Sequence, residues 1–304
     1  MISWLKQVMG ENPNWLRKPG SSLSFMKMST PEPEYGAEES KVLVFVFEEG
    51  ERRPTICAKT TRTYSAGEVI RNNYSNLQSL AEGVRGSVYA DMFAKPLYLH
   101  DKDNLVFSLE SVCPGVKFSL LERDTALVIE KYIGWQSHLA TSTEKTWGSG
   151  DITDLANKTI KTLGLSGDSA LVLSNYYKHL AFDSNVKLPV LVQHGDFTLD
   201  NVLIYGEQIN LIDYDHVGIS KLPGFDLFNL FLKSEGRIGL LRTNCERYLP
   251  QYFGKIGARI APESYDSILF VHYLQERQRK MHLEAYQEKS GEEIVNSFRS
   301  LVAK

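Results

Sequence analysis

Strand-like apolar patterns dominate the first third of the chain. Residues 41–47 (KVLVFVF) and 54–62 (PTICAKTTR) are rich in β-branched and aromatic residues and flank the turn EEGERR, which predicts a β-hairpin. A further short strand over 105–110 ends near Pro114-Gly115, a pair typical of turns. Residues 13–40 are rich in Pro, Gly, Ser and Glu and predict irregular loops.

Helical spacing prevails after Pro114-Gly115, where the second small β-unit, 190–213, is the exception. These patterns predict an α+β fold with two lobes: a small β-rich N-lobe over 1–112 and a larger, mainly helical C-lobe over 113–304. The helices are expected at 66–80 in the first lobe and at 120–141, 153–182, 226–248 and 264–285 in the second.

Composition narrows the class of protein. The 304 residues carry a net charge of −3, which argues against a nucleic-acid partner. No apolar run reaches the roughly 18 residues that a membrane span needs, and the N-terminus lacks the pattern of a signal peptide. The cysteines, Cys57, Cys113 and Cys245, are far apart and odd in number, so we expect reduced thiols in a cytoplasmic protein.

The candidate chemistry lies in 191–218, LVQHGDFTLDNVLIYGEQINLIDYDHVG. Strands over 201–205 and 209–213, joined by a three-residue loop, would place Asn201 opposite Asp213. Their side-chain oxygens are ligands that Mg²⁺ accepts, and Asp196 could take the proton of an attacking hydroxyl. Asp and Asn side chains that bond their own loop backbone are an alternative, but the complete order H-x-D-x4-N, strand, turn, strand, I-D favours a site.

Three segments carry a resemblance to a known family: HGDFTLDNVLI, INLIDYDHVG and PGFDLFNLF. Together they resemble the aminoglycoside phosphotransferase and choline kinase family, which has the protein-kinase-like fold. The resemblance implies Asp196 as catalytic base, Asn201 and Asp213 as Mg²⁺ ligands, and His194 and Asp226 as supports of the catalytic loop. A helix N-cap for Asp226 and a core position for His194 are the alternatives.

The resemblance extends to nucleotide contacts in the first lobe. ICAK (56–59) is similar to the kinase strand whose lysine binds the phosphates of ATP, which implies that role for Lys59. The same likeness implies that adenine bonds to the Glu110 carbonyl and the Val112 N–H. A solvated strand lysine and an ordinary strand end are the alternatives. No G-x-G-x-x-G precedes Val42, and 28–40 holds one glycine, so this loop offers phosphates fewer backbone donors.

Helix geometry selects the partner of Lys59. Positions 70, 73, 74 and 77 form one inward stripe, whereas Glu68 lies about 160° from Ile70 at about 100° per residue. We therefore predict that the Asn73 side-chain oxygen accepts a hydrogen bond from Lys59, and that Glu68 faces water. This neutral contact in place of an ion pair would hold Lys59 loosely until phosphate binds, and Asn73→Glu would be tolerated or would improve ATP use.

The predicted function is an ATP- and Mg²⁺-dependent phosphotransferase acting on a hydroxyl of a small molecule or glycan, of the sugar, aminoglycoside or amino-alcohol type. An inactive kinase-like binding module is one alternative. A metal-dependent phosphate-ester hydrolase is another, and it would need further ligands from His194, Asp200, Asp215 and His216.

Charged and aromatic residues of the second lobe bear on the class of acceptor, although they do not identify the compound. Residues 226–304 hold 12 basic and 10 acidic residues, which is no acidic excess and favours a neutral or anionic acceptor. Six aromatic residues could stack on a sugar, but core positions are the more ordinary assignment: Trp135, Tyr248, Tyr252, Phe253, Phe270 and Tyr273.

Overall fold

The computed structural model describes residues 2–29, 41–121, 125–180, 184–234, 240–280 and 290–303. The chain forms two compact units. The first comprises Met1–Val116 and Leu203–Asp215, and the second comprises Lys117–Val202 and His216–Lys304. Residues 203–215 thus group with the β-rich unit, although the sequence division at 112/113 placed them in the second lobe.

The first unit is built on a five-stranded antiparallel sheet in the order β1-β2-β3-β5-β4. The predicted hairpin is confirmed as β2 and β3, with Leu43 opposite Lys59. The expected strand at 105–110 is confirmed as β5. The strands are β1 (Leu23–Ser29), β2 (Lys41–Glu48), β3 (Ile56–Thr61), β4 (Pro96–Lys102) and β5 (Leu105–Ser111).

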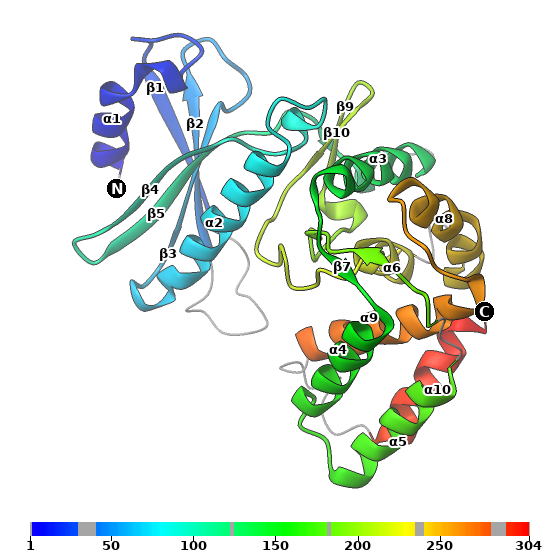
Figure 1. Ribbon diagram of the computed structural model, residues 1–304. Coiled ribbons are helices and arrows are strands. Elements are labelled where there is room, and N and C mark those ends of the chain that lie inside the picture. Colours follow the sequence, from blue (N-terminus) through cyan, green and yellow to red (C-terminus); the bar gives the residue numbers. More distant parts are fainter. Residues whose placement is uncertain are drawn as a thin grey trace. The chain divides into compact units, whose positions relative to one another are not determined.

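The two faces of this sheet have different helices and different chemistry (Figure 1). Ala58 joins a buried cluster with Leu5 and Met9 of α1 (Ile2–Glu11). The next residue, Lys59, points to the opposite face because side chains alternate along a strand, and there it bonds to α2 (Glu68–Gly83). The apolar face therefore fixes the sheet, and the other face carries polar groups.

The expectation of irregular loops over 13–40 is wrong for part of that range. Residues 23–29 form β1, which pairs with β2 so that Phe25 lies opposite Val46. Most of its residues are exposed, as at a sheet edge, so the alternating burial that reveals a strand is weak there. Residues 30–40, including the glycine-poor loop expected near the phosphates, lie outside the described residues.

The second unit is mainly helical, as predicted. The helix expected over 153–182 is two helices, because Gly164 has φ 63 and Ser166 caps the next helix by accepting a hydrogen bond from the Ser169 N–H at 3.3 Å. The helices are α3 (Ala126–Ser142), α4 (Ser149–Thr162), α5 (Gly167–His179), α6 (Phe225–Lys233), α8 (Leu241–Lys255), α9 (Tyr265–Arg279) and α10 (Gly291–Val302).

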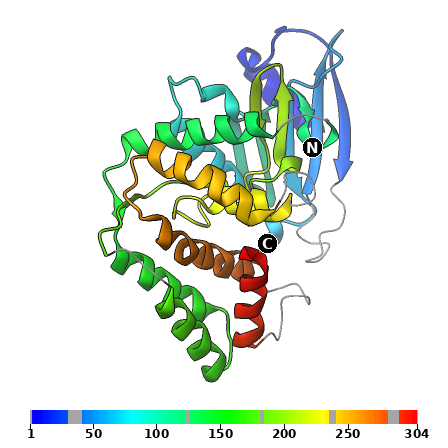
Figure 2. The same ribbon diagram turned by 90° about the vertical axis from the view of Figure 1, so that its right-hand side faces the viewer.

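Close packing joins α5 and α10, which lie side by side in both views (Figures 1 and 2). A Cβ atom on Gly291 would lie 2.3 Å from the Ser169 carbonyl oxygen, so only glycine allows this approach. The aromatic residues considered as sugar platforms are core residues instead. Their side chains are buried: Trp135, Tyr248, Tyr252, Phe253, Phe270 and Tyr273.

Two expectations from composition can be compared with the structure. Cys57, Cys113 and Cys245 are free thiols, and burial raises the pKa of each to about 12. In the described ranges, every helix is too short or too polar to cross a bilayer.

Candidate active site

The segment with the candidate chemistry contains two short strands, β9 (Val202–Tyr205) and β10 (Gln208–Leu211). Gly206 and Glu207 form the turn between them, which has two residues instead of the expected three. Gly206 has φ 64, in the left-handed region that tight hairpin turns favour. The two expected strands are therefore present with shifted bounds, and the register drawn from a three-residue loop over 201–213 is wrong.

Asn201 and Asp213 lie just outside these strands. Asn201 ends the short 3-10 helix Leu199–Asn201, and Asp213 follows β10 with φ 68. Asn201 belongs to the second unit and Asp213 to the first. Their shared binding of Mg²⁺ stays a prediction.

Asp226, in the first turn of α6, binds the backbone of the candidate catalytic loop through its carboxylate. Its Oδ2 accepts hydrogen bonds from the His194 N–H at 2.6 Å and the Tyr132 hydroxyl at 2.8 Å, and its Oδ1 accepts from the Gly195 N–H at 2.8 Å. Burial raises the pKa of Asp226, although these hydrogen bonds oppose the shift. The carboxylate thus bonds to the loop, while Gly224 occupies the N-cap of the helix.

Gly195 gives this loop its shape. Its φ is 83, and a Cβ atom there would lie 1.9 Å from the His216 carbonyl oxygen. The neighbouring Gln193 carbonyl accepts a hydrogen bond from the Gly218 N–H at 2.9 Å. The backbone before Asp196 is therefore held between Asp226 on one side and residues 216–218 on the other, with His194 fully buried.

Asp196 meets both an amide and cations. Asn201 Nδ2 donates to the Asp196 carbonyl at 2.9 Å and to its Oδ2 at 3.0 Å. The ammonium of Lys233 lies 2.6 Å from Oδ1, and the guanidinium of Arg279 lies 3.6 Å from it. Burial alone would raise the pKa of Asp196, but these cations outweigh it and hold the pKa below its ordinary value. Asp196 is therefore an ionised carboxylate.

Glu276 holds the cations around Asp196 in place. Its side chain is 3% exposed and lies 2.7 Å from Arg279, 3.0 Å from Lys280 and 3.6 Å from Lys233. The sequence reasoning missed this group. The signal was the spacing of Glu276, Arg279 and Lys280 at i, i+3 and i+4 near the end of a predicted helix.

Lys59 has two partners in the first unit. Its ammonium donates to Asn73 Oδ1 at 3.1 Å, which confirms the predicted hydrogen bond, and it lies 2.9 Å from Glu110 Oε1. Burial alone would lower the pKa of Lys59, but Glu110 outweighs it, so the pKa lies above its ordinary value. Glu68 is 67% exposed and pairs with Arg71, as its place on the helix predicted. The expectation of a loosely held, unpaired Lys59 is wrong, because Glu110 supplies the ion pair.

The Val112 N–H, which was expected to bind adenine, already donates a hydrogen bond within the protein. The Val112 N–H donates to the Thr55 carbonyl at 3.0 Å, and the Ser111 N–H donates to the Lys95 carbonyl at 2.9 Å. A hydrogen bond from Val112 to adenine would have to replace the first of these. The Glu110 side chain faces Lys59, and a role for its carbonyl in adenine binding stays a prediction.

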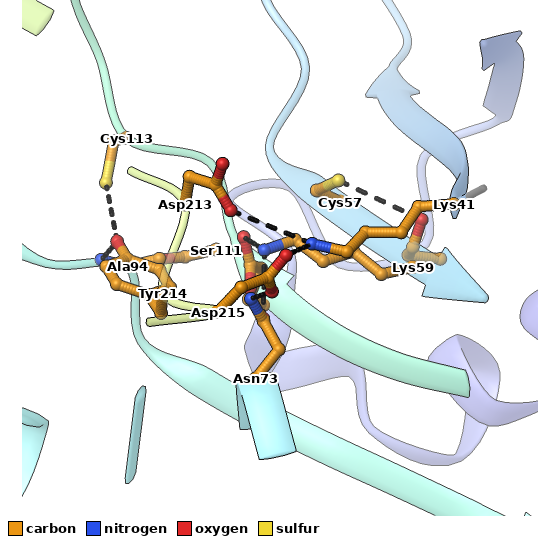
Figure 3. A network of polar contacts seen from close by, with 12 residues as sticks. Lys41, Cys57, Lys59, Asn73, Ala94, Ser111, Cys113, Asp213, Tyr214 and Asp215 are labelled. Carbon is orange, nitrogen blue, oxygen red and sulfur yellow. Dashed lines mark hydrogen bonds and ion pairs between the residues drawn. The ribbon is translucent and has the colours of Figure 1, made fainter. Parts of the chain in front are cut away.

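A polar network connects the Lys59 group to the end of β10 (Figure 3). Asn73 Nδ2 donates to Asp215 Oδ1 at 2.6 Å, and the other oxygen of Asp215 accepts a hydrogen bond from Lys41. Lys41 Nζ also lies 3.7 Å from Asp213 Oδ1. The sequence reasoning considered Asp215 only as a possible extra metal ligand and missed Lys41.

The network sharpens a prediction about Asn73. Asn73→Leu should weaken ATP binding about tenfold or more, because it removes one hydrogen bond to Lys59 and one to Asp215 and leaves buried charges poorly paired. Glu68→Ala, which alters only an exposed pair, should change the affinity by less than twofold. Calorimetric titration of ATP into both variants measures the ranking, and a larger effect of Glu68→Ala would contradict it.

The structure also revises the expectation for Asn73→Glu. A carboxylate at position 73 would face Asp215, whose oxygen now lies 2.6 Å from Asn73 Nδ2. Two carboxylates at this distance repel each other. We therefore expect Asn73→Glu to weaken ATP binding, contrary to the expectation from the sequence.

Comparison with known proteins gives the fold. Neither a family model nor a curated protein sequence matches the chain. Among solved structures, a thermostable mutant of aminoglycoside phosphotransferase APH(4)-Ia, in a ternary complex with ADP and hygromycin B, has a TM-score of 0.58 at 11% identity; the match covers 98% of this chain and 97% of that chain. An aminoglycoside 2′-phosphotransferase-IIIa mutant in a GDP complex has a TM-score of 0.50 at 12% identity, covering 99% and 97%.

These similarities confirm the protein-kinase-like fold: a small β-rich N-lobe and a larger, mainly helical C-lobe. Both of these solved structures are aminoglycoside phosphotransferases.

Proposed function

We propose that the protein is a phosphotransferase that moves the terminal phosphoryl group of ATP to a hydroxyl of a small molecule or glycan. The observation that carries the proposal is the loop over 194–201. Asp226 fixes its backbone through two amides, and Asn201 bonds to both the carbonyl and the carboxylate of Asp196. This arrangement presents one ionised carboxylate in a defined place, as a general base requires.

Asp196 would act on the acceptor. The acceptor hydroxyl oxygen forms a bond to the terminal phosphorus while the bond from phosphorus to the bridging oxygen of ATP breaks and ADP leaves. The hydroxyl proton passes to Asp196. Lys59 would bind the phosphates of ATP as a charged donor, with Glu110 and Asn73 orienting its ammonium.

Asp213 and Asn201 would be the Mg²⁺ ligands. The Asp213 carboxylate is 45% exposed and has a lysine ammonium 3.7 Å away, so it already attracts a cation. Carboxylate and amide oxygens suit Mg²⁺, which usually completes its coordination with water and substrate phosphate. When bound, the metal supplies positive charge to the phosphates during transfer.

The charges near Asp196 bear on the acceptor. Among the described residues, the cations Lys233, Arg279 and Lys280 group there with the carboxylates of Asp196 and Glu276. A polycationic acceptor would be repelled by this excess of positive charge, whereas a neutral or anionic one would not. We therefore favour a neutral or anionic hydroxyl compound over an aminoglycoside.

Two alternatives remain from the sequence reasoning. A binding module without turnover is disfavoured because Lys59, Asp196, Asn201 and Asp213 are all present. A phosphate-ester hydrolase with two metals needs several His, Cys, Asp or Glu ligands close together. The described part of the chain has no group of three or more such side chains, which disfavours the hydrolase.

The test is ADP release from Mg²⁺-ATP by the purified protein with a panel of hydroxyl compounds in three charge classes: neutral sugars, sugar acids and aminosugars. We expect ADP release that depends on both Mg²⁺ and a neutral or anionic acceptor. Release of phosphate from simple esters without ATP would support the hydrolase. Tight ATP binding without turnover on any compound of the panel would support the binding module.

A companion variant tests the metal ligand. Asp213→Asn should weaken Mg²⁺-ATP binding about tenfold or more, because a neutral amide replaces the anionic ligand. Binding of ATP in EDTA should change little. Calorimetric titration under both conditions separates the two effects, and normal Mg²⁺-ATP binding by the variant would show that Asp213 is not a ligand.

A further inference from the structure

Lys41 is the first residue of β2 and lies outside the set of residues assigned to the proposed reaction. Lys41 lies opposite Thr61, and Leu43 lies opposite Lys59. Residues two apart share one face of a strand, so Lys41 and Lys59 emerge on the same face as diagonal neighbours on adjacent strands. Diagonal neighbours on adjacent strands are about 7–8 Å apart. From this spacing, the ammonium groups of both lysines can reach phosphates of the same polyphosphate.

The side chain of Lys41 is held by carboxylates. It is 14% exposed, donates to Asp215 and lies 3.7 Å from Asp213. Lys41 thus places a positive charge next to Asp213 and Asp215 (Figure 3).

Mg²⁺ bound at Asp213 would compete with this arrangement. A divalent cation and an ammonium repel each other, so the metal would weaken the attraction between Lys41 and Asp213. Asn73 Nδ2 bonds to the other oxygen of Asp215 at 2.6 Å. Asp215 would therefore keep a hydrogen-bond donor if Lys41 turned away.

A phosphate ligand is the natural new partner for Lys41. Kinase-like proteins commonly hold nucleotide phosphates with the backbone N–H groups of a glycine-rich loop, but residues 28–40, directly before Lys41, contain a single glycine. An ammonium group supplies three donors and a full charge. A lysine that follows such a sequence can replace donors that the sequence does not favour.

We propose that Lys41 is a second phosphate-binding lysine that exchanges partners. Without nucleotide it pairs with Asp215 and Asp213, and with Mg²⁺-ATP it binds the nucleotide phosphates and leaves Asp213 to the metal. The proposal rests on the proposed phosphotransferase function, since it needs ATP at this face of the sheet.

The exchange predicts effects of opposite sign in one variant, Lys41→Met, which keeps an apolar stem. Binding of Mn²⁺ alone, measured by electron paramagnetic resonance, should become about three- to tenfold tighter, because Asp213 and Asp215 lose their competing ammonium. Binding of ATP in EDTA, measured by calorimetric titration, should become about tenfold weaker, because a charged phosphate contact is lost.

Two control variants accompany Lys41→Met. Lys18→Met removes an exposed lysine that pairs with Glu51 at 2.7 Å in the same unit, and it should change neither affinity. Lys41→Arg, which keeps the charge, should retain ATP binding within about threefold.

Each outcome has a distinct meaning. If Lys41→Met binds ATP as tightly as the unchanged protein, Lys41 is not a phosphate ligand. If Mn²⁺ and ATP both bind more weakly, Lys41 only supports the structure and the exchange is wrong. If the unchanged protein fails to bind ATP with or without Mg²⁺, the proposed function itself fails, and this result is distinguished from the others because it appears before any substitution.

Discussion

Asp196→Asn is expected to lower the kcat of phosphoryl transfer about 10²- to 10⁴-fold, the usual contribution of a general base. An amide cannot accept the proton of the acceptor hydroxyl. The loop should keep its shape, because Asn201 also bonds to the backbone carbonyl of residue 196 and Asp226 still binds the amides of His194 and Gly195. The Kd for Mg²⁺-ATP should therefore change less than about threefold.

Asp200→Asn is the matched control for this variant. Asp200 is an exposed carboxylate on the same segment, in the short helix that ends at Asn201. Its substitution should leave kcat within about twofold, as for an ordinary surface position. Equal kcat values for Asp196→Asn and the unchanged protein, measured by ADP release, would remove Asp196 from the role of base.

Local periodicity predicted the parts of the structure that depend on neighbours in sequence. Alternation along 41–47 gave the hairpin, and helix spacing placed Asn73 inward and Glu68 outward, both of which the structure confirms. These features follow from backbone geometry within one element. The family resemblance implied Asp226 as a support of the loop over 194–201, and the structure shows its hydrogen bond to the Gly195 amide.

Partners distant in sequence could not be predicted in this way. Lys59 contacts Glu110 on the neighbouring strand, Lys41 contacts Asp215 at a separation of 174 residues, and Lys233 of α6 contacts Asp196 on a loop. Each contact depends on how elements pack, which a single sequence does not specify. The hairpin register was missed for a local reason, since Gly206 at φ 64 forms a two-residue turn where three residues were assumed.

Two aspartates of the second unit, Asp196 and Asp226, illustrate how surroundings assign different roles to one side-chain type. Asp196 is partly exposed and faces ammonium and guanidinium groups, so it stays ionised and accessible. Asp226 is fully buried and faces two backbone amides and the Tyr132 hydroxyl. The first can exchange a proton with a ligand, and the second can only hold the backbone.

Asp226→Ala should therefore have the largest effect on stability, and we expect it to lower the free energy of unfolding by about 3–5 kcal/mol. The substitution removes the Asp226 oxygens that accept from the His194 and Gly195 amides, and it leaves the Tyr132 hydroxyl with only its bond to Gln193 Oε1 at 3.1 Å. Each buried donor without a partner costs about 1–3 kcal/mol, reduced in part by relaxation. Gly195 cannot relax far, because its backbone lies against the His216 carbonyl.

Tyr132→Phe separates the two parts of this effect, because it removes only the hydroxyl and leaves both amides bonded to Asp226. It should cost about 1–2 kcal/mol in urea unfolding, well below the cost of Asp226→Ala. Amide hydrogen exchange adds a local measurement: protection of the His194 and Gly195 amides should fall sharply in Asp226→Ala and stay nearly unchanged in Tyr132→Phe. Equal protection in both variants would show that the Asp226 carboxylate does not hold the catalytic loop, since the loop amides would then owe their protection to the surrounding packing alone.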